Sequence, residues 1–135
     1  MENLTQRIAR HEGLRLHPYK CPANKLTIGY GRNLEDRGIT KDEAMYLLQN
    51  DITDIKLNLV DRLPVFTKLN TIRQEVLIEM CYQIGINGVL KFRNMIKALD
   101  HNDFNKASIE MLDSRWAKQT PIRAKELSNL MKGGI

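Results

Sequence analysis

The sequence lacks any long apolar run, and no stretch approaches the 18 residues of a membrane-spanning helix. Its first residues, Met-Glu-Asn-Leu-Thr-Gln-Arg, contain no apolar signal-peptide core, so we expect a protein that is made and folds in the cytoplasm. Repeats and low-complexity tracts are also absent. Hydrophobic residues make up 42% and charged residues 27%, which is typical of a folded domain and excludes a disordered chain. We therefore predict a single domain, residues 1–135, with a core of its own.

Cysteine and histidine are scarce. The 2 cysteines are too few for a disulfide framework, and we predict that both are unpaired. Cys81 lies among apolar residues and is expected to be buried, whereas Cys21 precedes Pro22 in a turn. The 3 histidines lack metal-ligand spacing with Cys or Asp, so no metal and no cofactor are expected; they are His11, His17 and His101.

The chain also lacks a concentrated basic stripe, although its net charge is +5. This charge suits a polyanion, which includes nucleic acid, anionic lipid and an acidic cell-wall polymer. A basic helical nucleic-acid-binding domain is therefore an alternative function. Residues 40–60 resemble part of a helix-turn-helix, but acidic side chains are at least as frequent there as basic ones (Asp42, Glu43, Asp51 and Asp54), so we do not expect nucleic acid as a partner.

The most informative segment is residues 12–31, because it contains an acid, a thiol and a hydroxyl in close succession: Glu12, Cys21 and Thr27. Leu4, Ile8 and Glu12 recur at helical spacing, and Gly13 provides a stop. The first helix should therefore place Glu12 at its end on the apolar face, partly buried, as suits a general acid.

From Leu14 to Gly31 the period changes to two, which predicts a hairpin whose connection is residues 20–25, with Cys21 at its beginning. Apolar residues alternate with small or polar ones along its second strand: Leu26, Ile28 and Tyr30 against Thr27, Gly29 and Gly31. A face made of one threonine and two glycines allows a ligand to approach the backbone closely.

The rest of the chain reads as helical. Thr40 and Glu43 form a predicted capping box for a helix that continues to about Val60, long enough to bridge two lobes. Further helical patterns follow; one is stopped at Gly85 and Gly88, one ends near Trp116, and the last begins at Thr120-Pro121. The predicted fold class is α+β: a small lobe with a β-hairpin, about 13–60, and a larger all-helical lobe, about 61–135 plus the N-terminal helix.

Three blocks resemble the phage lysozymes, the endolysins of glycoside hydrolase family 24, which include the T-even type. The first is Glu-Gly-Leu-Arg-Leu (12–16), Tyr-Lys (19–20) and Leu-Thr-Ile-Gly-Tyr-Gly (26–31). The second is Ile-Glu-Met-Cys-Tyr-Gln-Ile-Gly (78–85) with Gly88 and Phe92, and the third is Ser-Arg-Trp-Ala-Lys-Gln-Thr-Pro-Ile-Arg-Ala (114–124). They lie in family order and cover nearly the whole chain.

The resemblance implies a lysozyme-like fold and hydrolysis of the β-1,4 bond between N-acetylmuramic acid and N-acetylglucosamine in peptidoglycan. By position, Glu12 would be the general acid, and Thr27 would orient the attacking water. Arg123 would pair with the catalytic glutamate. Four further positions would contact the sugar chain: Gly31, Tyr82, Gln83 and Asn94.

Two positions depart from the commonest family pattern. Arg32 replaces a frequent histidine, which we expect to affect local stability more than chemistry. Cys21 replaces a usual aspartate and gives a Glu-Cys-Thr variant of the triad. Most glycosidases use two carboxyl groups, so three roles stay open for Cys21: nucleophile, weak base for water, or bystander. Rival functions are a catalytically impaired wall-binding protein and non-hydrolytic cleavage to an anhydro sugar.

We expect a monomeric endolysin that needs no cofactor and has peptidoglycan as its partner. It would remain in the host cytoplasm until a separate holin permeabilises the membrane, and would then act on the wall from the periplasm. The last helix contains Lys, Arg and apolar residues (Leu127, Leu130 and Met131), which makes outer-membrane lipid a second candidate partner.

Overall fold

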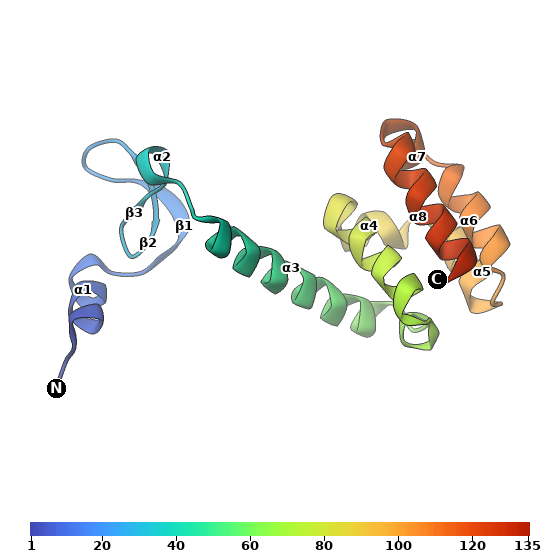
Figure 1. The fold of residues 1–135 in the computed structure, drawn as a ribbon, viewed down its shortest axis with the longest axis horizontal. Helices are drawn as coiled ribbons and strands as arrows, with labels where there is room; N and C mark the ends of the chain where they lie inside the picture. Colours follow the sequence, from blue (N-terminus) through green and yellow to red (C-terminus); the bar gives the residue numbers. More distant parts are fainter. The chain divides into compact units, whose positions relative to one another are not determined.

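The computed structural model describes residues 1–135, which form two compact units, Met1–Leu47 and Leu48–Ile135 (Figure 1). The boundary falls inside helix α3 (Lys41–Arg62), earlier in the chain than the expected limit near residue 60. The first unit also contains the N-terminal helix. The expected division into lobes stays a prediction, but the α+β class is confirmed, because the chain is mostly helical with one small sheet. No helix is long and apolar enough to cross a bilayer.

The first unit contains a three-stranded antiparallel sheet in the order β1-β2-β3. Its strands are β1 (Arg15–Lys20), β2 (Leu26–Gly29) and β3 (Arg32–Asn33). The predicted hairpin is therefore confirmed, whereas β3 was not anticipated because two residues carry no periodicity. Thr27 pairs with Tyr19 on one side and Asn33 on the other, so it occupies the middle of the sheet.

Helix α1 (Leu4–Glu12) begins at a capping box formed by Asn3 and Gln6, which the sequence analysis did not predict, and Gly13 ends it as predicted. The expected burial of Glu12 was wrong. Helix α1 contains no buried residue, Leu4 and Ile8 are 60% and 47% exposed, and Glu12 is exposed. The physical reason is that Thr27 is the one buried residue in the first unit, which offers α1 no apolar core to pack against.

Two short helical segments complete the first unit. Helix α2 (Leu34–Arg37) follows β3 directly, and the Asn33 side chain accepts a hydrogen bond from the backbone of Asp36 at its N-terminus. Helix α3 then begins at the predicted capping box: the Thr40 backbone donates to Glu43 at 2.8 Å, and the Glu43 backbone donates to the Thr40 hydroxyl at 3.1 Å.

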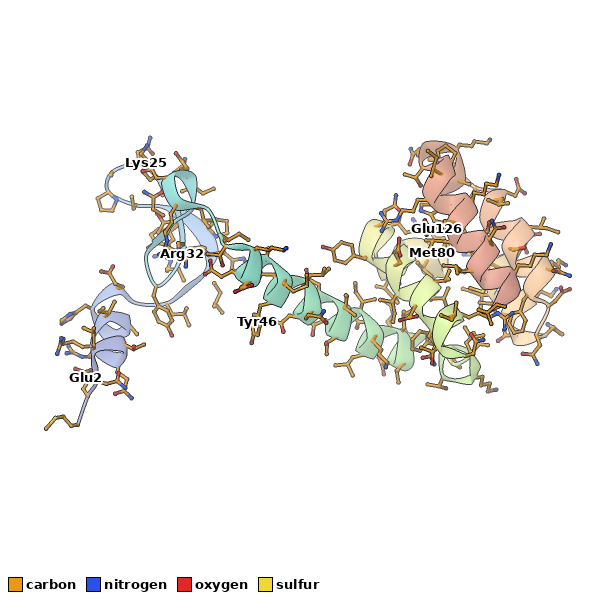
Figure 2. All side chains as sticks on the ribbon, viewed as in Figure 1. Glu2, Lys25, Arg32, Tyr46, Met80 and Glu126 are labelled. Atoms are coloured by element: carbon orange, nitrogen blue, oxygen red, sulfur yellow. The ribbon has the colours of Figure 1, made fainter.

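The second unit is entirely helical and contains every buried hydrophobic residue of the chain. Besides the remainder of α3, it consists of a 3-10 turn (Phe66–Lys68), α4 (Thr71–Leu90), α5 (Arg93–Asp100), α6 (Phe104–Leu112), α7 (Arg115–Gln119) and α8 (Pro121–Gly133). Helix α8 packs against α4, α6 and α7 (Figure 1). The largest fully buried side chains include Phe66, Leu77, Met80, Met111 and Met131, and Figure 2 shows Met80 inside the bundle.

Two helix boundaries differ from the sequence pattern. Gly85 adopts φ +80°, so α4 is broken there and resumes for a short stretch before α5. The helical pattern expected to run to Trp116 divides into α6 and α7. Ser114 causes this division: its hydroxyl donates to the Met111 carbonyl at 2.7 Å and accepts from the Ala117 backbone at 3.1 Å, which starts a new helix.

A cation from α4 closes the C-terminal end of α8. Arg73 donates to the carbonyls of Met131 at 2.7 Å and Lys132 at 3.0 Å, and its guanidinium lies 3.5 Å from the centre of the Phe104 ring. Gly134 follows in the left-handed conformation, and a Cβ there would lie 2.7 Å from the Arg73 Cζ. Arg73 thus satisfies carbonyls that the helix leaves without partners.

Candidate active site

The Cys21 thiol lies at the start of the tight turn that joins β1 to β2. The Asn24 backbone donates to the Cys21 carbonyl at 2.7 Å, and the Cys21 backbone donates to the Lys25 carbonyl at 3.0 Å. A hydrogen bond from the Lys25 backbone is the main cause that lowers the pKa of the Cys21 thiol, with a smaller contribution from the Thr27 hydroxyl. The turn therefore favours the thiolate and places the thiol within hydrogen-bonding reach of Thr27.

Thr27 is 3% exposed, whereas the sequence pattern placed it on a face open to ligands. Its hydroxyl donates to the Lys25 carbonyl at 2.9 Å. Thr27 lies in the central strand with a neighbour on each side, and its hydroxyl folds back onto its own strand. Cys21 and Thr27 are therefore brought together as one unit of structure, with both side chains turned toward the Lys25 backbone.

The Glu12 carboxylate lies against the turn between β2 and β3. A Cβ on Gly31 would stand 2.9 Å from Glu12 Oε2, and Gly31 adopts φ +77°. Only glycine combines this backbone conformation with so close an approach. Glu12 therefore lies at the end of β2, while the Cys21–Thr27 pair lies at its beginning. These four residues, Glu12, Cys21, Thr27 and Gly31, all belong to the first unit.

Arg32 bridges the sheet and α3 with a two-pronged ion pair. Its guanidinium donates to the two Glu43 carboxylate oxygens at 2.9 and 2.6 Å, and also to the Gly38 carbonyl at 3.1 Å. Arg32 holds the pKa of Glu43 at about 2, well below its ordinary 4.5, and the Thr40 backbone contributes to the same shift. Because Arg32 follows Gly31 directly, this pair fixes the strand next to the Glu12 contact.

In the second unit, Gln83 is held in one orientation by two neighbours. The Trp116 indole donates to Gln83 Oε1 at 2.8 Å, and Gln83 Nε2 donates to the Thr120 hydroxyl at 3.4 Å. The Thr120 hydroxyl in turn donates to the Trp116 carbonyl at 2.9 Å. Phe92 packs edge-on against Trp116 with ring centres 6.1 Å apart. Gln83 is therefore a fixed polar group in α4, two residues before the break at Gly85.

The other proposed contact residues of this unit lie in two places. Tyr82, 49% exposed, and Arg123 line a groove of about 510 Å³ with Ile78 and Glu79. Arg123 Nε donates to Glu79 Oε2 at 2.8 Å, so an ion pair that the sequence did not predict holds it within the unit. The expected pairing of Arg123 with Glu12, a residue of the first unit, stays a prediction. Asn94 instead lines a separate cavity of about 210 Å³.

Sequence reasoning missed the acidic residues that support the hairpin. Glu35 accepts hydrogen bonds from the Lys20 ammonium at 3.0 Å and the Leu26 backbone at 2.9 Å, and Asp36 pairs with Lys25 at 3.4 Å. The available signal was the pair of acids in the first turn of a short helix next to a basic hairpin. That signal does not specify the partners, because the contacts depend on how α2 returns along the sheet.

Comparison with known proteins places these residues in a family. The phage lysozyme family model matches residues 9–132. The chain is 30% identical to an "Endolysin" of Acyrthosiphon pisum secondary endosymbiont phage 1, over 82% of this chain and 75% of that protein. It is also 28% identical to "Pre-baseplate central spike protein Gp5" of Enterobacteria phage T4, over 98% of this chain and 28% of that protein.

A third relative is "Probable T4-type lysozyme 1" of Dictyostelium discoideum, 28% identical over 71% of this chain and 58% of that protein. The chain thus spans less than two thirds of the length of both the spike protein and this lysozyme. The matched range includes Glu12, the Cys21–Thr27 pair and Gln83. On the extent of that match, the chain belongs to the phage lysozyme family.

Proposed function

We propose that this protein is an endolysin muramidase, a glycoside hydrolase that cleaves the β-1,4 bond between N-acetylmuramic acid and N-acetylglucosamine in peptidoglycan. Glu12 is the general acid that gives its proton to the glycosidic oxygen as the bond to the sugar C1 breaks. The observation that carries the proposal is the position of the Glu12 carboxylate on Gly31, just after strand β2, whose second residue is Thr27, beside Cys21.

The bare backbone around Glu12 suits a sugar chain. Gly29 and Gly31 both have positive φ, and no atom outside their neighbours lies within 4 Å of a Cβ built on Gly29. A saccharide ring can therefore approach the backbone closely at Gly29. A glycosidic oxygen placed there lies within reach of the Glu12 carboxyl group, which is the geometric requirement for proton transfer.

The Cys21–Thr27 pair supplies the group that acts on the opposite side of the bond. Because the pKa of the Cys21 thiol is lowered, its thiolate serves either as a nucleophile that attacks C1 or as a base that takes a proton from the attacking water. In the third possibility Thr27 orients the attacking water and the thiol takes no part in the reaction. In each case water adds across the cleaved bond and Glu12 regains its proton over the cycle.

The test is lysis of outer-membrane-stripped Gram-negative cells by purified protein, with mass spectrometry of the released muropeptides. Glu12→Gln is expected to reduce the rate by about 10²–10⁴-fold, the usual contribution of a general acid. Glu126→Gln is the matched control, because Glu126 is an exposed glutamate on α8 (Figure 2). Near-normal lysis by Glu12→Gln would refute the acid assignment.

The Cys21 variants separate the remaining roles. Cys21→Asp restores the residue that the family commonly has and is expected to keep or raise activity. Cys21→Ser is expected to lose most activity if the thiol reacts, and little if it is a bystander. Products that contain an added water support hydrolysis, whereas anhydro sugars indicate the non-hydrolytic rival. A folded wild type that binds peptidoglycan without cleaving it would identify a wall-binding protein.

Action on the wall after membrane permeabilisation, from the periplasm, is part of this proposal. Leu127 and Met131 are buried in the second unit, so neither is available to contact outer-membrane lipid. The proposed lipid contact is therefore electrostatic. The exposed cations of α8, Lys125 and Lys132, remain available for anionic headgroups. If they contribute, Lys125→Gln with Lys132→Gln lowers killing of intact cells but leaves lysis of stripped cells unchanged; equal killing of intact cells would remove the lipid from the proposal.

A further inference from the structure

A single carboxylate oxygen connects the backbone segments that carry Cys21 and Thr27. Glu35 Oε1 accepts one hydrogen bond from the Lys20 ammonium at 3.0 Å and another from the Leu26 backbone N–H at 2.9 Å. Lys20 immediately precedes Cys21, and Leu26 immediately precedes Thr27. The two residues that Glu35 joins are also opposite each other, as the last pair of the β1–β2 ladder.

Backbone bonds also join these segments, through the β1–β2 ladder and the bond from the Cys21 N–H to the Lys25 carbonyl, and Glu35 adds a side-chain bridge at the last pair of that ladder. The Lys25–Asp36 contact is longer, 3.4 Å, and holds the turn by side chains alone. The sheet supplies no apolar layer beneath the turn, because Thr27 is the one buried residue of the unit. The Leu26 N–H has its acceptor on α2, and the Glu35 carboxylate adds support at a turn that has no apolar layer beneath it. Lys20 and Leu26 together hold the pKa of Glu35 below its ordinary value.

We propose that Glu35 is a positioning residue for the reaction: its carboxylate holds the ends of β1 and β2 together and so keeps the Cys21 thiol against the Thr27 hydroxyl. This inference rests on the proposed function for its catalytic consequence. Its structural consequence is independent of that function, because the same turn supplies the Lys25 backbone hydrogen bond to the thiol. If the ends of the strands separate, the thiol loses this bond and Thr27 moves away from it.

The first experiment measures the thiol directly, without substrate. In a Cys81→Ala background, the rate of Cys21 alkylation by iodoacetamide is followed against pH to give the pKa of the thiol. Glu35→Ala removes both acceptor bonds, and we expect the pKa to rise toward that of a free cysteine. Glu35→Gln keeps an oxygen acceptor for the Leu26 N–H and is expected to stay close to the wild type.

The second experiment measures catalysis in the same variants with soluble peptidoglycan fragments. Glu35→Ala is expected to lower kcat about tenfold with KM nearly unchanged, since a displacement well under 1 Å at a reacting group has an effect of this order. Glu35→Gln is expected to lose less than threefold. Glu2→Gln is the matched control, because Glu2 pairs with Arg10 at 2.8 Å on the same unit and away from the hairpin.

The outcomes decide between the explanations. An unchanged Cys21 alkylation profile in folded Glu35→Ala overturns the inference, and so does an equal effect in Glu2→Gln. If Glu35→Ala does not fold by circular dichroism, Lys20→Gln replaces it, and an unchanged profile there overturns the inference equally. A shifted profile in a protein that never cleaves peptidoglycan supports the positioning role and refutes the proposed function, so the two failures are distinguishable.

Discussion

Replacing Gly31 by alanine tests the position of the Glu12 carboxylate most directly. The added Cβ would stand 2.9 Å from Glu12 Oε2, whereas ordinary contacts of this kind begin at 3.4 Å. The carboxylate must therefore retreat by about 0.5 Å, the difference between these two distances. Since a misplacement of about 1 Å can cost about 10²-fold in rate, a displacement of half that size predicts a loss of about tenfold.

The same substitution also strains the backbone, because Gly31 adopts φ +77° and an L-residue there costs about 1–2 kcal/mol. Gly38→Ala provides the control. Gly38 adopts φ +64° in the same unit, and no atom lies within 4 Å of a Cβ built on it. Both variants should lose similar stability in thermal unfolding, but only Gly31→Ala should lose activity per folded molecule.

The measurements are clearing of stripped cells at a temperature where both variants are folded, and unfolding followed by circular dichroism. Equal activity losses in Gly31→Ala and Gly38→Ala would mean that backbone strain, not the Glu12 contact, controls the rate. Full activity in Gly31→Ala would mean that the carboxylate of Glu12 works from another position. Either result would refute the reasoning.

Three further predictions concern stability and reactivity. A thiol reagent should label Cys21 in the native protein, whereas Cys81, whose pKa burial raises to about 11, should react only after denaturant is added; equal rates by mass spectrometry would contradict this. Leu77→Ala should lower the free energy of unfolding by about 2–5 kcal/mol, since Leu77 is fully buried, and a loss below about 1 kcal/mol in urea titration would show that the core refills the space. The pKa of Glu43 is lower in the folded protein than in the unfolded chain, so the stability that its carboxylate contributes is present above pH 4.5 and is lost as the pH falls toward 2. The difference in melting temperature between wild type and Glu43→Gln should therefore shrink over that range. A constant difference would argue against the Arg32 ion pair as its source.

Local signals predicted much of the fold. The alternation before Gly31, the Thr40–Glu43 capping box and Pro121 at the first position of α8 are each specified by residues close in the chain, and each is present. The break at Ser114 was missed because no glycine or proline marks it in the sequence.

The candidate site was predictable only in part. Sequence spacing and family resemblance indicated Glu12, Cys21 and Thr27, but amphipathicity does not specify what covers an apolar face, so the expected burial of Glu12 was wrong. The supporting contact of Glu35 depends on the return of α2 along the sheet, which no local pattern encodes. The same holds for the Arg123–Glu79 ion pair, whose members are 44 positions apart.

Because Arg73 binds the C-terminal carbonyls of α8 beside Gly134, the residues tolerated at position 73 depend on the residue at position 134. A side chain at position 134 would occupy the volume of the guanidinium, so larger residues there become tolerable only if Arg73 is first shortened, and shortening Arg73 exposes carbonyls that Gly134 cannot serve. Selection from a combinatorial library randomised at both positions should therefore recover Arg73 with Gly134, or a joint replacement of the two, and should deplete the single changes.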